Sequence, residues 1–362
     1  MRLIATMGAT GIKHKHQYII DEKVYEGELS FIALAEAYGI EDIIVIGTKK
    51  SQESIQSILD KNNNIEMVVI ESSNVEDVFQ KSLEYIAENT ILDLTQGYRH
   101  YPMLTLLASV FLQNNSFKNI KDIYYALTID DCKPYEKSCK YQMTSLVIYL
   151  DIANMARIIN TFSNTLITLD YDVHSVEFKK LKEGLSELTK ELFSNNFEVS
   201  KEKAHGLVNL INTILEDKSL HIVEEHLTLL KKELQRIQNL VRIKESQTLL
   251  NVSEYFLKKD ILLHSVTLLY EAMVAFLDEK MTSRSRCTGE TDTYRRRNCL
   301  KKSLGNCRNV RNINNCRKFS DTLRAIDILR NKSAHGHTTG TYQEDLKDEL
   351  EEAIKVIRPI MA

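Results

Sequence analysis

An arginine, an asparagine and a histidine near the C-terminus are residue types that suit metal-free cleavage of RNA, although their spacing alone carries almost no information. They are Arg330, Asn331 and His335, in the segment RNKSAHG. A histidine with a near-neutral pKa can take the proton of a ribose 2′-hydroxyl or protonate the leaving oxygen. An arginine fork can hold the phosphate and offset the charge that builds on it. The products would carry a 2′,3′-cyclic phosphate and a 5′-hydroxyl.

The position of this motif relative to a helix end decides whether the two side chains can meet. Apolar residues from Leu323 to Leu329 predict a helix, and the glycines from Gly336 onward predict its end. On an unbroken helix, five residues at about 100° each would set the arginine and the histidine about 140° apart. Past a helix end they can converge, or meet their counterparts from a second copy. A helix-terminal arginine with a surface histidine is the alternative.

The first part of the chain alternates strand and helix patterns. Short apolar runs predict strands at 3–7, 43–46, 67–70, 91–94 and 123–127, and helical patterns separate them at 30–38, 75–88 and 103–113. This alternation predicts an α/β, Rossmann-like domain in which a parallel sheet has helices on both faces. Ligands of such sheets bind beyond the carboxyl ends of the strands.

Two loops follow predicted strands at that edge of the sheet. The first, Gly8-Ala9-Thr10-Gly11, could hold phosphates on backbone N–H groups, although an ordinary tight turn is the alternative. The second, DLTQGYRHYP, offers polar donors, an arginine fork and aromatic faces, which suit an anionic ligand that carries bases. Its candidate ligand-binding residues are Thr95, Gln96, Gly97, Tyr98 and Arg99, with Tyr101 as a second stacking face. A polar turn that caps the next helix is the alternative.

The second loop resembles the CARF domains of CRISPR type III accessory proteins, in the branch with an Asp-x-Thr-His-Gly motif. Here Asp93, Thr95 and Gly97 match, followed by Arg99 and Pro102, whereas Gln96 stands where His or Asn is usual. The resemblance implies a homodimer that binds cyclic tetra- or hexa-adenylate across its two-fold axis, with the Gly8 to Gly11 loop as a phosphate contact. The departure at Gln96 puts ring cleavage by this domain in doubt.

The second half of the chain has helical periods only. Leu227, Leu230, Leu234 and Ile237 form one apolar stripe, and the segments 249–257 and 261–277 continue in helical period. The Arg330-Asn331…His335 motif after such helices resembles the HEPN ribonuclease domain, in which two copies form one composite site. We therefore expect a CARF-like sensor domain at 1–140, an all-α connector at 141–244 and an all-α HEPN-like domain at 245–362.

A basic stretch precedes the candidate catalytic motif. Between Arg284 and Lys318 there are eleven Lys or Arg and two acidic residues, and we expect Arg295, Arg296 and Arg297 to contact RNA. A solvated charged loop is the alternative. The same stretch holds Cys287, Cys299, Cys307 and Cys316, whose spacing lacks the CxxC pairs of ordinary zinc sites. His14 and His16, in the segment KHKH, favour a basic loop over a metal site.

The overall composition limits the partners. The 362 residues have a net charge of −3, so nucleic acid must be bound by a local basic patch. The N-terminus lacks the pattern of a signal peptide, and no apolar run is long enough to span a bilayer. We therefore expect a cytoplasmic protein with no membrane contact, and six cysteines present as reduced thiols.

Together these features predict a metal-independent endoribonuclease that cyclic oligoadenylate activates and that degrades single-stranded RNA in antiviral defence. We expect no metal and no cofactor besides the activator, and no stable complex with the CRISPR effector. Gating is expected because an always-active ribonuclease would be toxic. Two alternatives remain open: a non-catalytic regulator that senses the same ligand, and a ring nuclease that degrades the activator.

Overall fold

The computed structural model describes residues 1–9, 14–71, 74–116, 120–129, 132, 137–216, 223–280, 287, 293–304, 313, 315–334 and 342–362. Their contacts divide the chain into two compact units. Unit 1 comprises Met1–Ala156 and Asp170–Lys179, and unit 2 comprises Arg157–Leu169 and Lys180–Ala362. No helix in the described ranges is both long enough and apolar enough to cross a bilayer.

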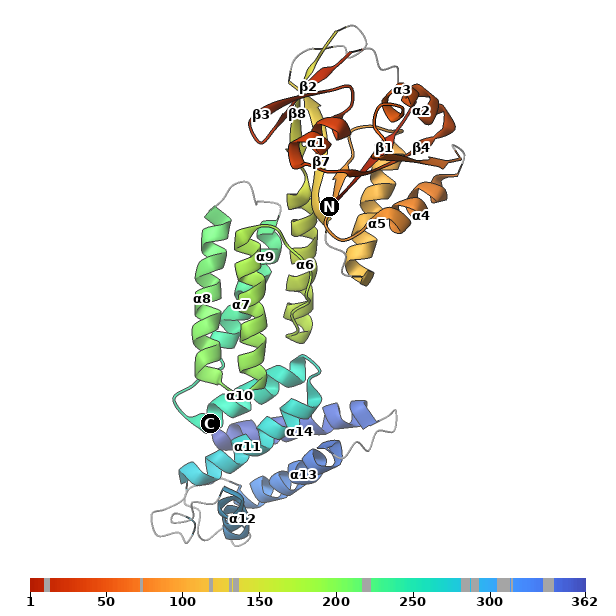
Figure 1. Ribbon diagram of the computed structural model, residues 1–362. Helices are drawn as coiled ribbons and strands as arrows, with labels where there is room; N and C mark the ends of the chain where they lie inside the picture. Colours follow the sequence, from red (N-terminus) through yellow and green to blue (C-terminus); the bar gives the residue numbers. More distant parts are fainter. Residues whose placement is uncertain are drawn as a thin grey trace. The chain divides into compact units, whose positions relative to one another are not determined.

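Unit 1 contains an eight-stranded mixed sheet in the order β3-β2-β8-β7-β6-β1-β4-β5 (Figure 1). The strands are β1 (Arg2–Met7), β2 (His16–Ile20), β3 (Lys23–Gly27), β4 (Asp42–Thr48), β5 (Ile65–Ile70), β6 (Thr90–Asp93), β7 (Ile120–Thr128) and β8 (Lys140–Ser145). The five strands predicted from the apolar runs form its parallel part, β7-β6-β1-β4-β5.

The strand order reverses beside β1. Within the parallel part, β4 and then β5 lie on one side of β1, and β6 and then β7 lie on the other. The boundary between β1 and β6 is therefore a topological switch point. In open α/β sheets, ligands bind outside the carboxyl ends of the strands at such a point.

Helices cover both faces of this sheet, as predicted. Alternate residues of β1 enter different cores, because successive side chains of a strand point to opposite faces. Leu3, Ala5 and Met7 pack with α1 (Ser30–Tyr38), whereas Ile4 packs with α4 (Val75–Tyr85) and α5 (His100–Ser116). Two short helices, α2 (Lys49–Ser54) and α3 (Gln56–Leu59), follow β4. The α1 helix ends at Gly39 in the left-handed region, which glycine adopts at little cost.

The rest of the described chain is helical, as the sequence predicts. Two helices cross the division between the units along the chain, α6 (Val147–Thr165) and α7 (Val176–Phe193). Unit 2 contains α8 (Phe197–Glu216), α9 (Glu224–Gln238), α10 (Glu245–Lys258), α11 (Leu262–Lys280), α12 (Thr293–Leu304), α13 (Cys316–Ala334) and α14 (Tyr342–Met361). The predicted stripe on α9 is buried, from Leu227 to Ile237. The core of the C-terminal helices is built around α11, α13 and α14.

Three strands were not predicted. The β2–β3 hairpin and β8 extend the sheet beyond β7, where β8 runs antiparallel to β7 and parallel to β2. His16, which the sequence placed in a basic loop, begins β2 and is buried. Its Nδ1 accepts a hydrogen bond of 3.1 Å from the Cys139 backbone N–H. His16 is thus a structural residue of the sheet.

The prediction of reduced cysteines is wrong for the described residues. Disulfides join Cys132 to Cys139 in unit 1 and Cys287 to Cys299 in unit 2, and Cys316 is disulfide-bonded as well. The prediction rested on the expected compartment. In each described pair the folded chain brings the two Cα atoms to 5.7 Å, which a disulfide can span. Cys307 lies outside the described residues.

A buried ion pair fixes the segment 170–175 to the start of α6. Asp151, which is almost fully buried, accepts hydrogen bonds from the backbone N–H groups of His174 and Ser175, at 2.8 and 2.7 Å. Its other oxygen lies 2.8 Å from His174 Nδ1, and His174 Nε2 lies 2.7 Å from the Ile120 carbonyl oxygen. Both ring nitrogens therefore face acceptors. The bond to Asp151 raises the pKa of His174, although burial opposes this shift.

We expect the stability of the chain to fall as the pH rises through the raised pKa of His174. The protonated ring is favoured in the fold, so its contribution is complete below about pH 6.5 and is lost above the folded pKa. The substitution His174→Gln should remove this pH-dependent part, on the order of 1 kcal/mol. Unfolding temperatures at pH 6 and pH 9 measure it. His205→Gln, at an exposed histidine of α8, is the control; an unchanged pH dependence in His174→Gln would contradict the assignment.

Candidate functional site

The two predicted ligand loops meet at the switch point of unit 1. Gly8 follows β1, and Gly97 lies in the loop after β6, which pairs with β1. A Cβ on Gly8 would lie 3.2 Å from the Gly97 carbonyl carbon, so the two backbones are in contact. The Thr6 hydroxyl, at the end of β1, donates to the Gln96 carbonyl oxygen in a short bond. The sequence-predicted residues Gly8, Ala9 and 95–99 are thereby brought together; Thr10 and Gly11 lie outside the described residues.

A buried carboxylate fixes the position of the second loop by hydrogen bonding. Asp93, at the end of β6, is fully buried. It accepts a 2.5 Å hydrogen bond from Ser30 Oγ at the start of α1 and a 2.9 Å bond from the Thr95 backbone N–H. Burial raises the pKa of Asp93, and the bonds from Ser30 and Thr95 oppose that shift. Thr95 is also tied to the sheet, because its Oγ1 accepts a 3.0 Å bond from the Ala126 backbone N–H. Asp93 and Thr95 therefore hold the loop in place.

The side chains that face solvent are those that follow Gly97. Tyr98 is 38% exposed, and Arg99 is exposed with no ion-pair partner among the described residues. Tyr101, which the sequence offered as a second stacking face, is only 1% exposed. It packs in the core under the first turn of α5, with its ring edge-on to Tyr98 at 5.3 Å. One aromatic face and one free guanidinium therefore remain for an anionic ligand with bases.

The described part of the candidate catalytic motif is the last turn of α13. That helix ends at Ala334, so Arg330 and Asn331 are helical, and His335 lies outside the described residues. The apolar residues Leu323, Ile326 and Leu329 are buried and fix the face of the helix, as predicted. Asn331 is exposed, and the side chain of Arg330 is one-quarter exposed.

Two residues that the sequence reasoning missed position the Arg330 guanidinium. Its Cζ lies 3.9 Å from the centre of the Tyr270 ring on α11, which is a cation–π contact. Its Nη2 lies 3.2 Å from Asp327 Oδ1 and donates to Asn331 Oδ1 at 3.3 Å. The Asp327 contact spans three residues of one helix and could have been read from the sequence. The Tyr270 contact comes from another helix, and no local pattern indicates it.

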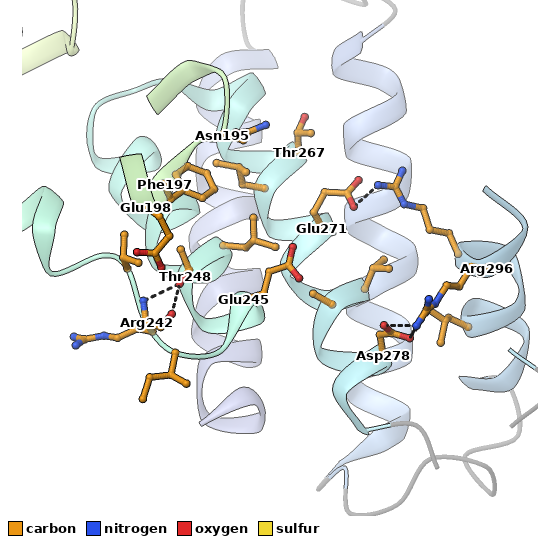
Figure 2. A pocket seen from close by; sticks show the side chains of 18 residues that line it. Asn195, Phe197, Glu198, Arg242, Glu245, Thr248, Thr267, Glu271, Asp278 and Arg296 are labelled. Carbon is orange, nitrogen blue, oxygen red and sulfur yellow. Dashed lines mark hydrogen bonds and ion pairs between the residues drawn. The ribbon is translucent and has the colours of Figure 1, made fainter. Parts of the chain in front are cut away.

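The predicted RNA-binding arginines lie on α12, beside a pocket of about 780 Å³ in unit 2 (Figure 2). Arg296 makes a bidentate ion pair with Asp278 of α11, at 2.8 and 2.7 Å. Arg297 pairs with Glu271 at 2.7 Å, the dashed line at Glu271 in Figure 2. The fold therefore partly neutralises this basic cluster with carboxylates of α11. Arg295 is exposed at the surface of α12.

Comparisons with solved structures give distant likenesses, one of which is described here. No family model and no curated protein matches this chain. Among solved structures, a chain of Enterococcus italicus Csm6 bound to cyclic hexa-2'-fluoro-hexa-dAMP aligns with 99% of this chain and 93% of its own length. The two are 11% identical, with a TM-score of 0.45. A likeness this distant carries no argument about what the present chain binds or does.

We expect Gly97→Ala to destabilise unit 1 by about 1 to 3 kcal/mol, because Gly97 has φ of +119°. The added Cβ would also lie 2.9 Å from Thr6 Oγ1. Gly206→Ala is the matched control, since a Cβ there meets open space within a helix and should stabilise by about 1 kcal/mol. Thermal unfolding of both variants measures the difference. If Gly97→Ala unfolded at the same temperature as Gly206→Ala, the contact between the Gly8 and Gly97 loops would not be rigid.

Proposed function

We propose that this chain is a CARF–HEPN ribonuclease of a CRISPR type III system, activated by cyclic oligoadenylate. Unit 1 would bind the ring at the carboxyl ends of β1 and β6, and the C-terminal helices would cleave single-stranded RNA without a metal. The observation that carries the proposal is the contact between the Gly8 and Gly97 loops at the switch point. It supports a site in which backbone N–H groups meet phosphates.

The surface of α5 supports the proposal of a homodimer. Four large apolar side chains are exposed at helical spacing on one face of this helix, namely Met103, Leu106, Leu107 and Phe111. Contiguous exposed apolar surface marks an interaction site. The helix begins directly after Arg99, so a two-fold axis beside α5 would bring two copies of the ligand loop to one symmetric ring.

The chemistry of cleavage follows from Arg330 and His335. A phosphate could take the place of Asp327 as the partner of the Arg330 guanidinium, while the Tyr270 ring holds the arginine in place. His335 would take the 2′-hydroxyl proton, and the oxygen would attack the adjacent phosphorus with departure of the 5′-oxygen. The step releases a 2′,3′-cyclic phosphate and, after protonation of the leaving oxygen, a 5′-hydroxyl. Two copies of the motif would form one composite site.

We expect Arg330→Ala and His335→Ala each to abolish cleavage of a quenched RNA reporter in the presence of cyclic oligoadenylate. Binding of the activator should survive in both, because the substitutions lie outside unit 1. Arg324→Ala, at an exposed arginine of the same helix, is the control and should cleave normally. Chelator should leave the wild-type rate unchanged. Full activity of purified His335→Ala, or strict dependence on Mg²⁺, would refute the proposed site.

We expect Arg99→Ala to raise the concentration of cyclic oligoadenylate needed for half-maximal cleavage. The guanidinium is exposed and has no ion-pair partner within the described ranges, so a ring phosphate would be its natural partner. Its loss should leave the maximal rate at saturating activator unchanged. An activation curve that coincides with that of the wild type would place the ligand elsewhere.

A further inference from the structure

A second pocket of unit 2, of about 650 Å³, is lined by an excess of positive charge. It lies among α9, the segment after it, α10 and α14. Five basic side chains and two carboxylates line it, namely Arg236, Arg242, Lys258, Lys259 and Arg358 with Glu233 and Glu254. The first pocket, which shares Arg242 with the second, differs because its four acidic residues outnumber its three arginines.

The two carboxylates organise four of the five cations. Glu233, which is buried, pairs with Lys259 in a short contact and with Arg236 at 3.0 Å, and it accepts a 2.8 Å bond from the Tyr255 hydroxyl. Burial opposes ionisation, but the bonds from Lys259 and Tyr255 lower the pKa of Glu233 below its usual value. The floor of the pocket is therefore an ionised, fully bonded network.

The rim of the pocket repeats this pattern. Glu254 pairs with Lys258 at 3.1 Å and with Arg358 of α14 in a short contact. Each carboxylate thus pairs with two cations. Each group of one carboxylate and two cations therefore has a net charge of +1. The charges come from separate helices held at one concave surface, where their fields add.

Arg242 adds a fifth cation to the pocket. Its backbone N–H donates to Thr248 Oγ1 at 2.8 Å, which fixes the segment between α9 and α10. Its guanidinium has no ion pair or hydrogen bond within the described ranges. Figure 2 shows this side chain extending away from Glu271 and Asp278, the carboxylates that neutralise the arginines of α12. The guanidinium is therefore free to bind an anion.

We propose that this basic pocket binds the phosphodiester backbone of single-stranded RNA, an inference that rests on the proposed function and adds a substrate contact to it. Among the described residues that line the pocket, the one aromatic residue, Tyr255, is buried beneath Lys259, so they offer no exposed aromatic face. Bases have nothing to stack on there. Recognition by phosphate alone holds the strand without reading its sequence.

The test measures binding of a labelled single-stranded RNA to full-length His335→Ala protein over a range of salt concentrations. A phosphate contact to single-stranded nucleic acid contributes about 0.7 to the slope of log affinity against log salt. Arg242→Ala should weaken binding and reduce the slope by about that amount, and Arg242→Glu should weaken it further. Lys201→Glu, at an exposed lysine of α8 outside the pocket, should have no comparable effect.

Two results would overturn this inference. One is a salt slope for Arg242→Ala equal to that of its parent. The other is complete displacement of RNA by micromolar pyrophosphate, which would assign the pocket to a small phosphate ligand; long inorganic polyphosphate should compete. Failure here is distinguishable from failure of the proposed function. If the pocket does not bind RNA, the salt slope of Arg242→Ala is unchanged and activator-dependent cleavage by the protein remains intact. If the catalytic assignment is wrong, the effect of Arg242→Ala on RNA binding is unaffected.

Discussion

The contact between the loops after β1 and β6 is the constraint on which the proposed ligand site depends. The strand order reverses beside β1, and this chain places a glycine in each of the two loops that meet there. Larger side chains would separate the two backbones. The buried Asp93, bonded to Ser30 and Thr95, ties the second loop to α1. A ligand at the proposed site would therefore contact a loop that is bonded to α1.

The parallel core of the sheet and the helices could be predicted because their apolar residues repeat with a clear period. The β2–β3 hairpin and β8 could not, since strands such as KYQMTS and KVYEG lie at one side of the sheet and carry many polar residues. Tyr101 shows the same limit: it follows Tyr98 closely in sequence, but the first turn of α5 directs it into the core. The disulfides depend on approaches between segments of the folded chain that spacing alone does not reveal.

In unit 2, a run of basic residues in the sequence does not by itself indicate where positive charge remains unpaired in the fold. The run Arg295-Arg296-Arg297 is conspicuous in the sequence, yet Arg296 and Arg297 are paired with carboxylates of α11. The pocket between α9, α10 and α14 draws its cations from positions more than one hundred residues apart, including Arg236 and Arg358. Only the fold assembles that excess. Likewise, Arg330 could be named from the sequence, but the Tyr270 ring that holds it could not.

The proposed function requires that a ligand regulate RNA cleavage. The ligand must therefore bind the active arrangement of the protein more tightly than the resting one. The most direct measurement adds cyclic tetra- and hexa-adenylate separately to the purified wild-type protein with a quenched RNA reporter and EDTA. We expect little cleavage without a ring and rapid cleavage with one of the two. Cleavage at the same rate with and without every ring, or none under any of these conditions, would contradict it.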